Sequence, residues 1–168
     1  MPFPQIGGLS PQQSRVSGSI ARAASVTGVD FDYLLAQAGL ESSYDPSAKA
    51  PTSSATGLFQ FTEQTWLGMV DRHGQKYGMG WAAGAISAGS DGRYRVSDPT
   101  MRSQILNLRF DAEKSSMMAA EFASENRAHL RSGLGWEPES VDLYLAHFLG
   151  AGRVNLENLV QQGQSIIT

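Results

Sequence analysis

Residues 41–44 (Glu-Ser-Ser-Tyr) and residues 57–61 (Gly-Leu-Phe-Gln-Phe) are the two segments whose residue types could do chemistry. The first places a carboxyl group at the end of a helical stretch, and the second follows it across a turn-rich segment. A carboxyl group that stays protonated near neutral pH can act as a general acid. An acid at a helix end that faces a Gly-Leu-x-Gln segment can protonate a glycosidic oxygen. The pair therefore predicts cleavage of a sugar chain.

The helix that leads to Glu41 determines how far this carboxyl group is exposed. Asp30 can cap the start of the helix. Apolar residues then recur at the i, i+3, i+4, i+7 spacing of one buried face, namely Phe31, Leu34, Leu35 and Ala38. At about 100° per residue, Glu41 falls roughly 70° from the centre of this stripe, at its margin. Partial burial and the negative end of the helix dipole would both raise its pKa, although a last-turn Glu that simply faces water is the alternative.

The segment after the helix returns the chain towards Glu41. Asp45 precedes a proline and therefore ends the helix, and residues 47–56 have the Ser, Thr, Ala and Pro content of a surface loop. Gly57 then allows a close approach of the backbone, and the amide of Gln60 can both donate and accept hydrogen bonds. This segment is expected to form one side of a sugar site.

Aromatic residues supply the flat apolar surface that a sugar ring needs. Phe59 and Phe61 flank Gln60, and core packing is expected for one of the two. Trp81, in a glycine-rich stretch, is a further candidate for stacking on a sugar, whereas Trp66 lies at helical spacing with other apolar residues and is expected in the core.

These residues resemble the soluble lytic transglycosylase family, the bacterial relatives of goose-type lysozyme. The family's first signature is a catalytic Glu followed by Ser, a turn, a Gly-Leu-Met-Gln-like stretch and then Thr-Trp, which here falls at residues 41–42, 57–60 and 65–66. A diverged second signature lies at 111–122, where the Asn of the family is lost, and a third lies at 146–154. The resemblance covers residues 20 to 160, and it implies an all-α, lysozyme-like catalytic domain with a substrate groove.

The third signature departs from the family at its most consequential residue. In the family a Tyr of this motif hydrogen-bonds the catalytic Glu and orients it, and here His147 stands in its place. An imidazole can make the same contact, but its cation would lower the pKa of Glu41 and weaken it as an acid. Tyr144, one helical turn earlier, could contribute a hydroxyl instead. The alternative for His147 is a structural role, as a core histidine that is hydrogen-bonded within the protein.

The resemblance also implies a mechanism with a single carboxyl group. The Glu of the family protonates the glycosidic oxygen and then removes the proton from the C6 hydroxyl of the sugar, which closes a 1,6-anhydro ring on muramic acid. Glu41 would do both in peptidoglycan, between N-acetylmuramic acid and N-acetylglucosamine. Ser42, Gln60, Phe61 and His147 would surround the scissile bond.

Two alternatives stay open at this point. A hydrolase on the same fold, a muramidase or a chitinase, normally needs two carboxyl groups about 5 to 9.5 Å apart. Asp45, Glu63 and Asp71 are the acids close to Glu41 in sequence, and none lies on a clear apolar margin. The second alternative is an inactive glycan-binding or structural module of a secretion, flagellar or phage assembly, which the replacement at His147 keeps open.

Composition agrees with an enzyme that acts on glycan strands. The chain has 168 residues, enough for one domain with its own core, and a formal net charge of −3 without the basic stripe of a nucleic-acid-binding protein. No apolar run approaches the ~18 residues that span a membrane. A periplasmic, extracellular or cell-wall location is expected, yet the first residues lack the features of a secretory signal. A signal removed from this chain, a longer protein, a phage particle or an export machine would explain this.

Helices are expected almost throughout. Capping residues and apolar spacing predict them over 10–27, 30–44, 62–74, 98–108, 111–131, from 137, and over 155–161. Residues 74–98 are rich in glycine and are expected to form an irregular segment between core helices. The sequence shows no convincing alternation of polar and apolar residues that would predict a strand.

Two segments resemble motifs of other enzyme classes, but the sequence around them does not support either motif. Residues 78–83 resemble a dinucleotide fingerprint, and residues 85–89 resemble a nucleophile elbow, but no hydrophobic strand precedes either. The three histidines do not have the spacing of metal ligands. No metal and no cofactor are predicted.

Overall fold

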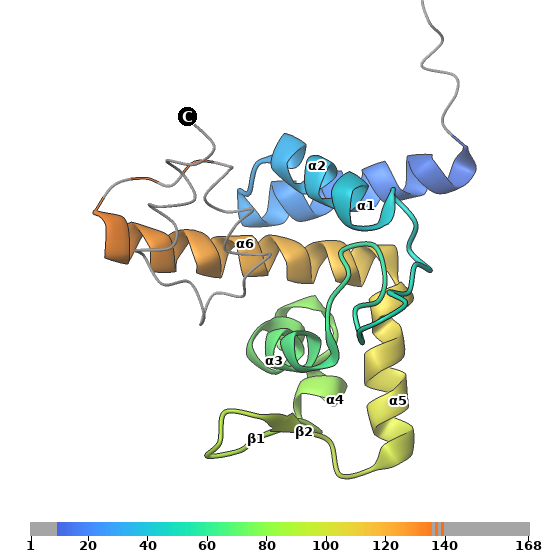
Figure 1. Ribbon diagram of the computed structural model, residues 1–168, viewed down its shortest axis with the longest axis vertical. Coiled ribbons are helices and arrows are strands. Elements are labelled where there is room, and N and C mark those ends of the chain that lie inside the picture. The colour runs from blue at the N-terminus through green and yellow to red at the C-terminus, as the bar shows by residue number, and fades with distance from the viewer. Residues whose placement is uncertain (1–9, 136, 138, 140–168) are drawn as a thin grey trace, which may run out of the picture. The chain divides into compact units, whose positions relative to one another are not determined.

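The protein is mainly α-helical. The computed structural model describes residues 10–135, 137 and 139, and this part of the chain contains six α-helices and one small two-stranded hairpin (Figure 1). The chain divides into two compact units, residues 1–120 and 121–168. The helical class expected from the sequence is confirmed. The single lysozyme-like domain with a substrate groove stays a prediction.

Helices α1 (Pro11–Thr27) and α2 (Phe31–Ser42) pack against each other. Helix α1 begins with a capping box, in which the Ser10 hydroxyl accepts from the Gln13 backbone N–H at 3.2 Å and the Gln13 side chain accepts from the Ser10 N–H at 2.9 Å. It ends at Gly28, whose φ of 77° lies in the left-handed region that glycine adopts without strain. The predicted starts of both helices are therefore confirmed.

Helix α3 (Glu63–His73) lies in the core of the first unit. Thr62 caps it, and its Trp66 is fully buried with the indole Nε1 donating to the carbonyl of Ile105 at 2.9 Å. The ring of Phe61 contacts the Trp66 ring at a centroid distance of 5.2 Å. The prediction of Trp66 as a core residue is confirmed.

The glycine-rich segment contains short elements packed on α3. They are η2 (Gly74–Tyr77), α4 (Gly80–Ala83) and a hairpin of β1 (Ser87–Ala88) with β2 (Tyr94–Arg95). The hairpin was not predicted from the sequence, because its strands are two residues long and depend on contacts distant in sequence. Gln64 of α3 donates to the Tyr94 carbonyl and accepts from the Tyr94 N–H, both at 2.9 Å.

The first unit closes with α5 (Pro99–Asn107), η3 (Leu108–Phe110) and the start of α6 (Ala112–Leu134). Asp98 caps α5, and the Asp111 side chain accepts from the backbone N–H of Lys114 at 2.9 Å. Both predicted starts are confirmed, and α6 runs three residues beyond its predicted end at Arg131. The predicted helices after residue 137 lie outside the described residues.

Candidate active site

Glu41 lies in the last turn of α2, closer to the buried face than the sequence predicts. The buried residues of α2 are Tyr33, Leu34, Gln37 and Ala38. Phe31 is 37% exposed and Leu35 is only partly buried, so the predicted stripe was wrong at these two positions. At 3.6 residues per turn, Glu41 projects within about 20° of Leu34. The side chain is therefore centred on the buried face and not at its margin.

The environment of Glu41 suits a general acid. The residue is partly buried, and this burial raises the pKa of its carboxyl group above the ordinary value. Its place in the last turn, near the negative end of the helix dipole, acts in the same direction. A raised pKa keeps more of the carboxyl protonated near neutral pH, as proton donation requires.

The chain leaves α2 through two residues with left-handed backbone. Ser43 has φ 53° and Tyr44 has φ 64°, a region that non-glycine residues seldom adopt. The Tyr44 ring folds back over Gly39, where an added Cβ would lie 2.7 Å from the hydroxyl oxygen of Tyr44. Such a conformation persists only when the surrounding structure holds it. The helix therefore ends sharply, two residues before the predicted end, with Glu41 on a fixed backbone.

Ser42 joins the two motif segments. Its hydroxyl donates to the carbonyl oxygen of Leu58 at 2.7 Å and accepts from the backbone N–H of Asp45 at 3.2 Å. The first bond spans 16 residues and places the Gly-Leu-Phe-Gln segment beside the end of α2. Ser42, predicted to bind substrate, thus contacts the protein's own backbone, and this contact positions the segment.

Gln60 organises the returning segment. Its backbone is left-handed, with φ 54°, and its Nε2 donates to the carbonyl oxygens of Ala48 at 3.1 Å and Gly57 at 2.9 Å. Both amide hydrogens are therefore used within the loop. If Gln60 contacts a sugar as predicted, it can do so only through its side-chain oxygen, which accepts hydrogen bonds.

The aromatic residues differ from expectation. Phe59 and Phe61 are 0% and 2% exposed, so both rings belong to the core and neither offers a face to a ligand. The expectation that one of the two would face the sugar was wrong, because Phe61 packs on Trp66. Trp81 is 48% exposed on α4, an element that packs on η2 and α3.

Tyr144 and His147 lie outside the described residues, together with the third motif. In residues 10–135, 137 and 139, no three His, Asp or Glu side chains gather as metal ligands would. Two of the three acids near Glu41 in sequence, Asp45 and Glu63, have other partners. Asp45 accepts from the N–H and hydroxyl of Ser47, which lowers its pKa, and Glu63 pairs with Arg102 at 2.6 Å.

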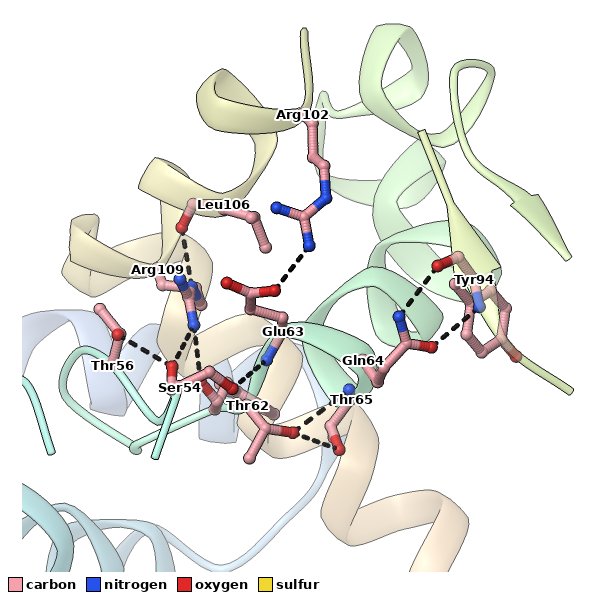
Figure 2. A network of polar contacts seen from close by, with 11 residues as sticks. Ser54, Thr56, Thr62, Glu63, Gln64, Thr65, Tyr94, Arg102, Leu106 and Arg109 are labelled. Atoms are coloured by element: carbon pink, nitrogen blue, oxygen red, sulfur yellow. Dashed lines mark hydrogen bonds and ion pairs between the residues drawn. The ribbon is translucent and has the colours of Figure 1, made fainter. Parts of the chain in front are cut away.

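A network centred on Arg109 supports the returning segment from its other side (Figure 2). Arg109 is a buried residue, 7% exposed, and its guanidinium group donates to the carbonyl oxygens of Leu106 at 2.9 Å, Ser54 at 2.7 Å and Phe61 at 3.0 Å. Burial lowers the pKa of Arg109, and the nearby Glu63 carboxylate opposes this effect. Arg109 therefore binds both ends of the loop that carries Gln60. We call these contacts the Arg109 network.

Gly57 is the point where the returning segment touches this network most closely. Its φ is 87°, and a Cβ at this position would lie 2.1 Å from the backbone carbonyl oxygen of Arg109. That oxygen also accepts from the Ser115 hydroxyl at 2.8 Å. Only glycine fits here, as the sequence predicts for a close backbone approach.

Two residues of this region escaped the sequence reasoning. Gln37 lies on the same helix face as Leu34, Ala38 and Glu41. It was missed because the search for a buried face considered only apolar residues. Arg109 gives no local signal, since its partners Ser54 and Phe61 are 55 and 48 residues away.

A hollow in the first unit lies at α1 and the start of α6. A cleft of about 720 Å³ runs between α1 and the start of α6, and among its lining residues are Arg15, Arg22, Pro46 and Glu113. Arg22 and Glu113 pair across it at 3.4 Å, with both side chains more than half exposed. Pro46 connects it to the loop that follows Glu41.

Comparison with known proteins does not assign the chain to a family: no model of a known family matches it. No helix among the described residues has the length and apolar character to cross a membrane.

Proposed function

We propose that this protein is a lytic transglycosylase that cleaves the β-1,4 bond between N-acetylmuramic acid and N-acetylglucosamine in peptidoglycan. The observation that carries the proposal is the 2.7 Å bond from Ser42 to Leu58, which sets the Gly-Leu-Phe-Gln segment beside the helix end that bears Glu41. The carboxyl group there has a pKa raised by burial. Motif spacing and local electrostatics thus agree on Glu41 as the acid.

A single carboxyl group favours ring closure over hydrolysis. Glu41 would give its proton to the glycosidic oxygen as the bond to the muramic acid C1 breaks. The resulting carboxylate would take the proton of the C6 hydroxyl as O6 bonds to C1, which regenerates the acid and leaves an anhydro end. Asp45 and Glu63 are committed to Ser47 and Arg102, so neither is poised as a second carboxylate.

The site would act where glycan strands lie, in the periplasm or at the cell wall. The partner it requires is a peptidoglycan strand. A secretion, flagellar or phage assembly that must pass the wall is a setting in which such an enzyme would work.

The test is the identity of the muropeptides released from purified peptidoglycan. Wild-type protein should release anhydro-muramyl products, and Glu41→Gln should lower their rate of release by a factor of about 10² to 10⁴. Asp45→Asn is the matched control, since it removes a neighbouring charge but keeps a turn-forming side chain and should leave the products unchanged. Products with reducing ends would indicate a hydrolase. No release by the folded wild-type protein would favour a glycan-binding module.

A further inference from the structure

Gln37 is a buried amide with no hydrogen-bond partner. The residue is 2% exposed, and neither its Nε2 nor its Oε1 is bonded. Buried polar groups in folded proteins are nearly always paired, and an unpaired one costs about 1 to 3 kcal/mol. A leucine or methionine of similar size would avoid this cost. The amide therefore calls for a role outside the resting fold.

The position of Gln37 indicates the group that it serves. It lies four residues before Glu41 on the same helix face, where side chains are neighbours with Cβ atoms about 5–6 Å apart. The backbone on either side of Glu41 is held by the Ser42 bond to Leu58 and by the N–H of Ser43, which donates to the Gly39 carbonyl at 3.0 Å. Gln and Glu side chains at this spacing are long enough for an amide and a carboxyl group to form a hydrogen bond.

The chemistry of the two states of Glu41 decides when the contact forms. A hydrogen bond from an amide N–H to a carboxylate is roughly twice as strong as one between neutral groups. The contact is therefore worth most after Glu41 has lost its proton, when a donor to its partly buried carboxylate gives the largest stabilisation. Catalytic hydrogen bonds that are long in the resting protein often tighten during the reaction.

We propose that Gln37 is a positioning residue for Glu41, whose Nε2–H donates to the Glu41 carboxylate in the interval between its two proton transfers. The interval begins when Glu41 protonates the leaving glycosidic oxygen, and it ends when the carboxylate takes the proton of the C6 hydroxyl. Gln37 itself gains and loses no proton. This inference rests on the proposed function, because only an acid that becomes a base passes through that interval.

In the described part of the chain, the other charged groups near α2 are exposed or held by partners of their own. Helix α2 packs against α1, whose charged residues Arg15 and Arg22 are exposed, the latter paired with Glu113. Asp32 at the start of α2 is also exposed. In the adjoining loop, Asp45 is bound by Ser47, and Lys49 lies over the Phe110 ring. These groups are the same in wild type and in a Gln37 variant, so their effects cancel in a comparison.

The test is the pKa of Glu41, measured by NMR titration of protein labelled with ¹³C in the Glu carboxyl groups. Glu41→Gln assigns the signal by its disappearance. Gln37→Leu should raise the Glu41 pKa by about half a unit or more, because a donor to the charged form is lost. Ser116→Ala is the matched control, since its hydroxyl is also fully buried and unpaired but lies on α6, and it should leave the Glu41 pKa unchanged. Equal pKa values in wild type and Gln37→Leu would overturn the proposal.

A second measurement does not require a Gln37 variant to fold. The side-chain NH₂ signals of Gln37 in the wild-type protein should shift with the titration of Glu41 and should become independent of pH in Glu41→Gln. Signals that ignore the Glu41 titration would overturn the proposal, and would mean that trapped water satisfies the amide. Neither titration uses a substrate. A failure of the proposed function, seen as absent muropeptides, is thus distinguishable from a failure of this inference.

Discussion

The Arg109 network and the end of α2 both remove polar side chains from water, yet they do so in opposite ways. Arg109 makes three hydrogen bonds to backbone carbonyls, which hold Ser54, Phe61 and Leu106 in place. At the end of α2, burial raises the pKa of Glu41, and the neighbouring Gln37 has no partner. A satisfied buried network makes a segment rigid. The unpaired amide of Gln37 can instead form the proposed hydrogen bond when Glu41 is deprotonated.

The two regions meet in the returning segment. Ser42 holds it from the α2 side, and Arg109 holds it from the α5 side. If the comparison is right, changes at Arg109 should alter the stability of the fold first, whereas changes at Glu41 should abolish activity while the fold persists. Three variants can break or sharpen this contrast.

Gly57→Ala should have the largest effect on stability. Its Cβ would meet the backbone carbonyl oxygen of Arg109 at 2.1 Å, so backbone and not a flexible side chain must shift. We expect a loss of about 4 kcal/mol in the free energy of unfolding, measured by urea denaturation. Gly78→Ala is the control, because Gly78 has φ 76° and an added Cβ there would meet nothing within 4 Å, so the variant should lose only about 1 kcal/mol. Equal losses would mean that contact with Arg109 is unimportant.

Arg109→Met should come next. The variant keeps the apolar stem but leaves the carbonyls of Ser54 and Phe61 without their charged donor, which should cost about 3 kcal/mol in unfolding free energy. Arg102→Met is the matched control, since the Arg102–Glu63 pair is more than one-third exposed and should contribute about 0 to 1 kcal/mol. Denaturation of the two variants side by side measures the difference. A stable Arg109→Met protein would show that the network is not structural.

Glu41→Gln should have the smallest effect on the free energy of unfolding. This variant should gain stability, whereas Gly57→Ala and Arg109→Met should lose it. The folded-state pKa of Glu41 is raised, so its contribution to stability is present below the ordinary value of 4.5 and is lost as the pH rises through the folded pKa. Glutamine carries no charge at any pH. The variant should therefore gain stability over the wild type as the pH rises from 4 towards 7, with midpoints of urea denaturation as the measurement. A gain that does not change across this range would contradict burial of the charge.

Local signals in the sequence were enough to predict the starts of α1, α2, α3, α5 and α6 but not α4. Ser10, Asp30, Thr62, Asp98 and Asp111 all begin helices as predicted, because a capping side chain bonds to backbone only two or three residues away. The signature pairing of Glu41 with the Gly-Leu-Phe-Gln segment could also be anticipated from the motif.

Features that depend on distant residues could not be predicted in this way. The hairpin is held by Gln64, thirty residues from Tyr94, and the loop is held by Arg109. The burial of both Phe59 and Phe61 follows from how the loop closes over α3, which residue types alone do not specify. The apolar spacing also predicted the wrong buried face for α2, because it included Phe31, which lies in the first turn and is exposed.

The central claim is that Glu41 alone cleaves the glycan without adding water, and digestion of peptidoglycan in ¹⁸O-labelled water tests it most directly. Ring closure by the C6 hydroxyl predicts muramyl ends that carry no ¹⁸O and are one water lighter than reducing ends, with their formation lost in Glu41→Gln. Muramyl ends that carry ¹⁸O would contradict the claim, because they would require an attacking water and a second carboxyl group.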